Sequence, residues 1–240
     1  MNNNPTYQQP LCTSCATSIG SNTATTRQRD VNETITTAND TVRLVPQLRF
    51  PEFQDTGKWE GVSLGGEMGL CELRNGYTPS KDNTNYWRDG VIPWFRMEDI
   101  RENGRILNDA IQHITIEAVK GKLFEANSVI MSTSATIGEF ALITTTYLAN
   151  QRFTNLCIRK SSRKNVDVFF FFYYCYQISK WCKRNTNLGG LLSVNVENLK
   201  KYKLYIPTNK YEQQKIADCL HSLDDYIAAT TQKLEQLKLH

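Results

Sequence analysis

Long apolar runs are absent from this sequence, which excludes a membrane-spanning helix of ordinary length. The longest apolar and aromatic stretch lies around Phe169–Tyr176. It has less than half of the roughly 20 residues that a helix needs to cross a bilayer. The chain also opens without a basic and then apolar segment, so no secretory signal is expected. We therefore expect a cytoplasmic protein with no membrane partner, whose seven cysteines stay reduced.

Signatures of metal binding and catalysis are also scarce. Cys12 and Cys15 form one C-x-x-C pair, but a structural zinc site usually needs a second pair, and the sequence has none. The three histidines, His113, His221 and His240, do not have the spacing of metal ligands. The glycines form neither a phosphate-binding loop nor a dinucleotide fingerprint. The sequence thus predicts a binding protein with no catalytic residue, no metal and no cofactor.

Composition divides the chain into three parts. In residues 1–41, twenty-two residues are Asn, Gln, Ser or Thr. Such a segment buries too little apolar area to offset its ordering entropy, so we expect a disordered polar leader. Residues 42–208 alternate short apolar runs with turn residues, and residues 209–240 have helical spacing. The predicted fold class is α+β, a mixed α/β domain followed by a long C-terminal coiled-coil helix.

Within residues 42–208 the residue patterns indicate several short elements. Gly76–Gly90 is rich in Gly, Asn and Asp and is expected to be a long polar loop. Ile114–Gly121 is interpreted as a short helix, and Gly138 is expected to serve a tight turn. Strand-like or short apolar runs lie at Val62–Leu64, Val91–Phe95, Leu123–Ser132, Phe140–Thr146, Phe153–Ile158 and Leu204–Ile206.

Val166–Arg184 has conflicting signals. Its consecutive aromatic residues favour a strand by intrinsic propensity. Its length favours a helix, because buried strands rarely run so long. Lys183 and Arg184 lie where cations stabilise the C-terminal end of a helix. We interpret the segment as a buried helix.

The last segment has the spacing of a coiled coil. Asn209 and Glu212 form a capping-box pattern at its start. A helix over this segment would be roughly 45 Å long, and its apolar stripe calls for a partner helix from another chain. A helix that packs on its own domain is the alternative. The predicted seam consists of Ile216, Leu220, Leu223, Ile227, Leu234 and Leu237, with Thr230 as the polar exception.

Positive charge is concentrated in one stretch. Between Ala149 and Asn195 there are eight basic residues and a single acid, Asp167. A local excess of this kind attracts a phosphate backbone, although basic clusters are more often solubilising faces. Asn150 and Gln151 lie beside the cluster and carry amides that can pair with base edges.

Several short motifs follow one another between Val45 and the end of the chain. They are Val45–Phe53 with Trp59 and Leu64, Gly76 with Thr78–Ser80, Ile92–Trp94, Ser134–Gly138, Asn150–Gln151, Ile206–Pro207 and Glu212–Ala217. No single motif is specific, but their order and spacing together resemble DNA-specificity subunits of type I restriction–modification systems.

This resemblance implies a non-catalytic subunit. In the family, each target recognition domain reads one half of a bipartite site in double-stranded DNA. Long helices bind adenine methyltransferase subunits, and a motor-nuclease subunit adds translocation and cleavage. The family's subunit has two recognition domains and two such helices, whereas we identify one of each, at 42–208 and 209–240. We therefore expect either a half-subunit that forms a homodimer through its C-terminal helix or a truncated, silent cassette that acts only as a coiled-coil interaction protein.

Candidate roles follow from these implications. We expect phosphates to be bound by Arg152, Lys160, Lys164, Lys183 and Arg184. The candidate base-reading residues are Tyr77, Ser80, Lys81, Asn85, Tyr86, Ser134, Thr136, Asn150 and Gln151. Two rivals from other classes remain: a small nuclease with an unrecognised site, and a coiled-coil regulatory protein that never binds DNA.

Overall fold

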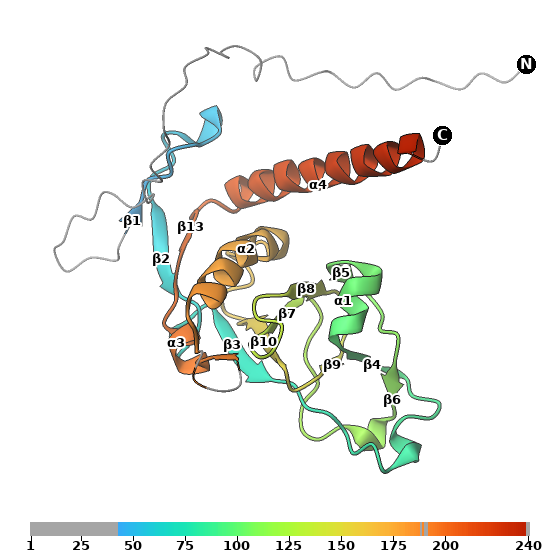
Figure 1. Cartoon of the computed structure of the whole chain (residues 1–240). Helices are drawn as coiled ribbons and strands as arrows, with labels where there is room; N and C mark the ends of the chain where they lie inside the picture. The colour runs from blue at the N-terminus through green and yellow to red at the C-terminus, as the bar shows by residue number, and fades with distance from the viewer. Residues whose placement is uncertain (1–42, 188, 190–191, 239–240) are drawn as a thin grey trace, which may run out of the picture. The chain divides into compact units, whose positions relative to one another are not determined.

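The computed structural model describes residues 43–187, 189 and 192–238, and these residues carry the predicted α+β fold (Figure 1). The expected leader at 1–41 lies outside the described residues. The helices are α1 (Met97–Asn103), α2 (Val168–Arg184), α3 (Val196–Lys200) and α4 (Lys210–Lys238). The strands are β1 (Arg43–Leu44), β2 (Trp59–Ser63), β3 (Cys71–Asn75), β4 (Ile92–Phe95), β5 (Ile106–Leu107), β6 (His113–Ile114), β7 (Ser128–Ser132), β8 (Phe140–Ile143), β9 (Leu148–Ala149), β10 (Phe153–Ile158), β11 (Thr186–Asn187), β12 (Ser193–Val194) and β13 (Lys203–Ile206).

A five-stranded sheet separates two cores. Its strand order is β3-β10-β7-β8-β5, with β5 parallel to β8 and the other neighbours antiparallel. Every residue of β7 is buried, because successive side chains point to opposite faces and a core covers each face. Val129 and Met131 enter the first core, against α2, whereas Ile130 enters the second core, near β4. The apolar side chains of β7 thus contribute to the cores on both faces of the sheet.

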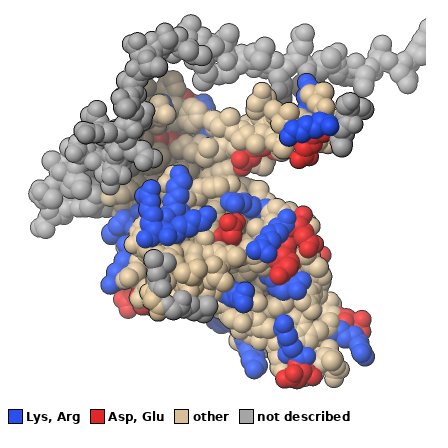
Figure 2. All heavy atoms as spheres, viewed as in Figure 1, with Lys and Arg blue, Asp and Glu red and all other residues tan. Residues whose placement is uncertain are grey.

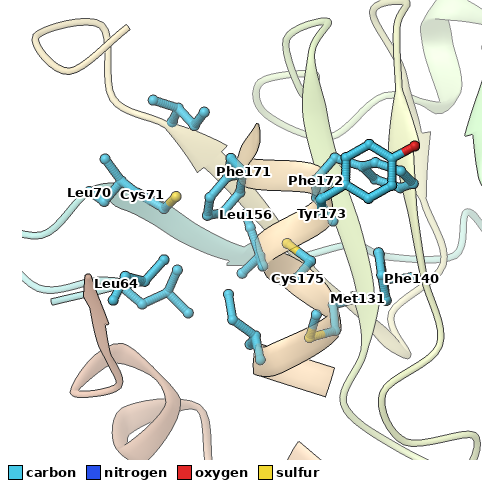
Figure 3. Packing of buried hydrophobic residues seen from close by; sticks show 14 of the residues in the cluster. Leu64, Leu70, Cys71, Met131, Phe140, Leu156, Phe171, Phe172, Tyr173 and Cys175 are labelled. Carbon is cyan, nitrogen blue, oxygen red and sulfur yellow. The ribbon is translucent and has the colours of Figure 1, made fainter. Parts of the chain in front are cut away.

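Helix α2 covers the first core and confirms the helical interpretation of the aromatic run. Asp167 caps it, since its Oδ1 accepts hydrogen bonds from the N–H groups two and three residues on, both at 2.9 Å. Phe171, Cys175, Ile178 and Cys182 recur at helical spacing and are all buried. Figure 3 shows Phe171 and Cys175 among the side chains that pack on the sheet. In Figure 1, α2 lies between the sheet and α4, both of which it contacts.

The helix predicted at Ile114–Gly121 is wrong. Ile114 is the last residue of β6 and pairs with Ile92 of β4. A single 3₁₀ turn, Ile116–Ala118, follows it. The β-branched residues of this segment favour extended backbone. The first of them, Ile114, pairs with β4 instead of starting a helix.

The predicted strands are confirmed with shifts in their ends. Phe153–Ile158 is β10, residue for residue. The strand predicted at Leu123–Ser132 begins only at Ser128. Asn127 has a φ of 60°, and this left-handed backbone cannot continue a strand.

Helix α4 begins with the predicted cap but without the predicted capping box. Asn209 Oδ1 accepts a hydrogen bond from the N–H of Tyr211 at 2.9 Å. Glu212 is fully buried and accepts hydrogen bonds from Arg49 and Trp59 rather than from the backbone of Asn209. A buried carboxylate is stable only with such partners, so this half of the prediction is wrong.

The predicted seam of α4 divides into two halves. Ile216 and Leu220 pack against the first core beside the buried Ala217, so here the helix packs on its own domain. From Leu223 onward the seam is exposed, and a partner helix stays a prediction for this second half. The exposed seam residues are Leu223, Ile227, Leu234 and Leu237, each more than half exposed.

None of the described helices combines the length and hydropathy needed to cross a membrane.

Candidate nucleic-acid interface

A second sheet, of order β6-β4-β9, places two loops side by side. β4 and β9 run parallel, with Phe95 opposite Ala149. The backbone N–H of Asn150 donates to the carbonyl of Phe95 at 2.9 Å. Arg96 and Asn150 therefore leave the carboxyl ends of neighbouring parallel strands, a position where loops of α/β sheets commonly bind ligands.

These strand ends form the floor of a surface hollow of about 660 Å³, which we call the basic hollow. Its lining joins four segments of the chain: the 81–101 region, Gln112 before β6, the turn at Thr136, and the residues at the start of β10. Five cations and one acid, Glu98, line it. The lining residues are Lys81, Thr84, Trp87, Arg88, Trp94, Arg96, Met97, Glu98, Arg101, Gln112, Thr136, Asn150, Arg152 and Phe153.

The five cations of the basic hollow are not neutralised by ion pairs within the described ranges. Lys81, Arg88, Arg101 and Arg152 are exposed, and Arg96 is half-buried. None of the five has a carboxylate within 4.0 Å among the residues that the structure describes. Unpaired cations around a concave surface focus positive potential and raise the local concentration of anions. The hollow is therefore suited to an extended polyanion.

Two tryptophans hold the polar loop that forms one wall. Trp87 and Trp94 pack edge to face, with ring centroids 4.9 Å apart. The indole N–H of Trp94 donates to the carbonyl of Tyr77 at 3.1 Å, and that of Trp87 donates to the carbonyl of Ser80 at 2.9 Å. The Gly76–Gly90 loop, predicted from its polar composition, is thus anchored at two points.

The predicted phosphate-binding residues separate into two groups. Arg152 lines the basic hollow. Lys183 lies against the neighbouring turn, since a Cβ added to Gly138 would lie 3.0 Å from Lys183 Cε. Lys160 and Lys164 follow the other end of β10. The sequence cluster therefore does not form one site.

The charge at the far end of β10 is partly neutralised. Arg163 and Lys160 both pair with Glu125, at 2.5 and 3.4 Å. The hydrogen bonds from Arg163 and then Lys160 lower the pKa of Glu125. Lys164 is exposed and makes no hydrogen bond or ion pair within the described ranges. This end consequently has fewer cations without a carboxylate partner in the described ranges than the basic hollow has.

Helix α2 carries further positive charge on its exposed side. Lys180, Lys183 and Arg184 are exposed near its C-terminal end. In Figure 2, Lys and Arg side chains gather over the part of this face where α2 lies in Figure 1. Gly138, which α2 contacts, has a φ of 83°, so the predicted tight turn is present.

The structure brings some of the candidate base-reading residues together. Lys81, Thr136 and Asn150 line the basic hollow. Gln151 is exposed next to them, and its Oε1 accepts a hydrogen bond from the hydroxyl of Thr78. Ser80 and Asn85 are exposed on the anchored loop, and Ser134 is half-buried beside Thr136.

The two tyrosines of this set have structural contacts. The hydroxyl of Tyr77 donates to the carbonyl of Ala118 at 3.1 Å and accepts from the backbone N–H of Lys120. Tyr86 packs against the second core. Both side chains are engaged in supporting the loop, so we leave them out of the set proposed to contact DNA.

Sequence reasoning did not identify several of the residues that line the basic hollow, namely Arg88, Arg96, Arg101 and Gln112. They lie outside the 149–195 stretch in which basic residues are densest. The described residues contain no group of three or more His, Cys, Asp or Glu side chains arranged to hold a metal ion.

Comparison with known proteins gives one consistent family. The sequence pattern described as "Type I restriction modification DNA specificity domain" matches residues 57–239. The type I restriction enzyme EcoprrI specificity subunit of Escherichia coli is 47% identical over 167 residues, which are 68% of this chain and 42% of that protein. The EcoR124I/EcoR124II specificity subunit of Escherichia coli is 28% identical over 78% of this chain and 44% of that protein.

Solved structures show the same fold. The HsdS subunit from Thermoanaerobacter tengcongensis has a TM-score of 0.55 at 17% identity, covering 79% of this chain and 42% of that chain. The S subunit of a type I restriction–modification system from M. genitalium has a TM-score of 0.53 at 15% identity, covering 79% and 44%. The chain spans less than half the length of these relatives.

Proposed function

The chain belongs to the family of type I restriction–modification DNA specificity domains, and we propose that it recognises a specific sequence in double-stranded DNA without catalysing a reaction. The observation that carries this proposal is the basic hollow, where five cations without carboxylate partners in the described ranges surround the ends of two parallel strands. Duplex DNA supplies the missing counter-charge at regular intervals.

In this proposal the domain at 42–208 binds DNA with two kinds of contact. Exposed cations bind phosphates and set the register, while polar side chains on the walls of the hollow contact base edges. The phosphate-binding set is Arg88, Arg101, Arg152, Lys183 and Arg184. The base-contacting candidates are Ser80, Lys81, Asn85, Ser134, Thr136, Asn150 and Gln151.

We propose that the segment 209–240 assembles the complex. The exposed half of the α4 seam supports pairing with another helix, because an apolar stripe of this kind is stable when a second helix covers it. The family implies adenine methyltransferase subunits and a motor-nuclease subunit as partners. A homodimer through α4 would place two recognition domains about a two-fold axis. Restriction–modification complexes act on DNA in the cytoplasm, which is the proposed location.

The test is the salt dependence of binding to a duplex of about 30 base pairs, measured by fluorescence anisotropy with the full chain. Each phosphate contact contributes about 0.9 to the slope of log K against log salt. Reversing Arg101 and Arg152 together to Glu is expected to weaken binding to every duplex and to reduce the slope by about 2, if each residue contacts one phosphate.

Lys160→Glu with Lys164→Glu is the matched control, because it makes the same change in net charge at the other end of β10. We expect this variant to bind nearly as wild type does. Equal losses in both double variants would show that net charge, and not the basic hollow, governs binding.

The exposed seam also favours a second candidate, a silent specificity cassette that acts only as a coiled-coil interaction protein. Under this alternative the chain pairs through α4 but binds no duplex, even at low salt. Retained self-association with no anisotropy change at any duplex concentration would favour it over DNA recognition.

A further inference from the structure

The backbone of Arg96 is fixed by a buried carboxylate. Its N–H donates to Asp99 Oδ2 at 2.6 Å. Asp99 is fully buried and accepts a second hydrogen bond, at 2.6 Å, on Oδ1 from the N–H of Ile111. One carboxylate therefore ties the end of β4 to the chain that follows α1. Arg96 starts from a fixed position, which a side chain that reads a base requires.

The side chain of Arg96 is also partly immobilised. It is half-buried, and its guanidinium carbon lies 5.7 Å from the centre of the Trp94 ring, within the range of a cation–π contact. Trp94 itself is buried, and its indole N–H is hydrogen-bonded. The planar guanidinium is thus held against a rigid wall of the hollow.

No hydrogen bond among the described residues uses the donors of the Arg96 side chain. Its Nε is buried without a hydrogen-bond partner in the described ranges. Neither of its terminal nitrogens pairs with a carboxylate there. A half-buried cation that lacks an acceptor is unfavourable by itself. The arrangement becomes favourable when a ligand brings acceptor atoms into the hollow.

The side chain of Asn150, the polar residue at the neighbouring strand end, already makes a hydrogen bond within the protein. Asn150 leaves the adjacent strand end, but its Oδ1 already accepts a hydrogen bond from the N–H of Arg152 at 2.9 Å. Its amide therefore stabilises the turn that presents Arg152, and bidentate pairing with adenine would need this same oxygen. Of the two side chains at the strand ends, Arg96 is better placed to read a base.

We propose that Arg96 is a specificity-determining residue that reads one guanine, donating from its guanidinium to O6 and N7 in the major groove. This inference rests on the proposed function and deepens it. The exposed cations Arg88, Arg101 and Arg152 suit phosphates, whose contacts tolerate a mobile side chain. Arg96 suits a base edge because two parallel N–H groups on a fixed plane match the two guanine acceptors and no other base pair in the major groove.

The experiment compares Arg96→Lys with Arg101→Lys in the full chain. Both variants keep the charge and remove the planar fork. Each protein selects duplexes from a pool with a randomised centre, and the bound fraction is sequenced. We expect Arg96→Lys to weaken a guanine preference at one position and to keep the rest of the motif, with discrimination at that position falling by up to roughly 150-fold. Arg101→Lys is expected to keep the whole motif.

A modified base gives a second readout that does not depend on the pool. Replacing the selected guanine with 7-deazaguanine removes the N7 acceptor. We expect this replacement to weaken binding by the wild type and by Arg101→Lys but to have little effect on Arg96→Lys. If Arg96→Lys unfolds, as a thermal melt would show, Arg96→Gln serves instead, because it keeps an extended side chain without the fork.

The outcomes separate the two proposals. If the wild type selects no motif and binds no duplex, the proposed function fails, and this inference fails with it. A lysine ammonium can also donate to O6 and N7, whereas a glutamine amide pairs with adenine. If the wild type selects a motif and both Arg96→Lys and Arg96→Gln retain all of it, only the inference is overturned. An equal loss of affinity for every sequence in Arg96→Lys would make Arg96 a phosphate contact and would also overturn the inference.

Discussion

A buried ion pair between Arg49 and Glu212 links the segment before β2 to the first turn of α4. The two side chains are 8% and 0% exposed. Glu212 accepts hydrogen bonds from Arg49 Nε and Nη2, each at 2.7 Å, and from Trp59 Nε1 at 3.0 Å. Arg49 also donates to the Gly57 carbonyl and to Thr56 Oγ1. This pair therefore joins the start of α4 to the segment before β2.

Arg49→Met should destabilise the fold by about 3–5 kcal/mol, because it leaves the Glu212 carboxylate buried without a cation. Arg49→Met combined with Glu212→Met should recover most of that loss, since an apolar pair of similar volume is often close to neutral in place of a buried ion pair. The free energy of unfolding of each variant is measured by urea denaturation. The interaction energy follows from the double-mutant cycle.

The matched control is the nearby pair of Lys215 and Glu52, whose side chains are 47% and 44% exposed. Lys215→Met should cost no more than about 1 kcal/mol, as exposed pairs do. A loss of less than 1 kcal/mol in Arg49→Met, equal to that of the control, would refute the reasoning. So would a double variant that is as unstable as the single one.

Three further predictions concern other parts of the chain. Leu223→Asp with Leu234→Asp should abolish the dimer or larger species that light scattering detects, because a charge on the apolar seam disfavours helix pairing. The melting temperature should not change, because both side chains are about half exposed. Persistence of the larger species would show that the seam is not the contact between chains. Gly138→Ala should destabilise the fold by more than about 1 kcal/mol in urea denaturation, because φ is 83° and the added Cβ would lie 2.7 Å from Ser179 Oγ; a neutral result would contradict the turn geometry. The lowered pKa of Glu125 gives stability that is present above the ordinary value of 4.5 and is lost as the pH falls through the lowered pKa. Glu125→Gln should flatten the acid side of a stability–pH curve, and an unchanged curve would count against the pairing with Arg163.

The elements with strong local signals were predictable from the sequence. Helix α2 was recognised because its length and its C-terminal cations outweighed the strand propensity of its aromatic residues, and β10 was placed residue for residue. The short helix expected after Ile114 failed because pairing with β4 decided its conformation. Glu212 was assigned to a local cap because Arg49, its partner, is 163 residues away in sequence. Such distant pairings leave no local pattern.

The candidate site was only partly predictable for the same reason. Counting charges along the chain found Arg152 and Lys183 but grouped them with Lys160 and Lys164, which β10 carries to its other end. Arg88, Arg96 and Arg101 are spaced among ordinary residues. Arg96 and Arg101 follow β4, whose carboxyl end lies beside that of the parallel β9, and the anchored loop before β4 carries Arg88 to the same hollow. A surface built from several loops is therefore a property of the topology, and a sequence window cannot show it.

Hydrogen–deuterium exchange of the full chain, with and without a saturating duplex, tests most directly whether DNA binds in the basic hollow. We expect added protection of backbone amides in the segments that line it, 81–101, around Gln112, 132–138 and 150–153, with little change at 160–164. Protection confined to 160–164 or to α4, or no protection anywhere although the duplex is bound, would contradict the account.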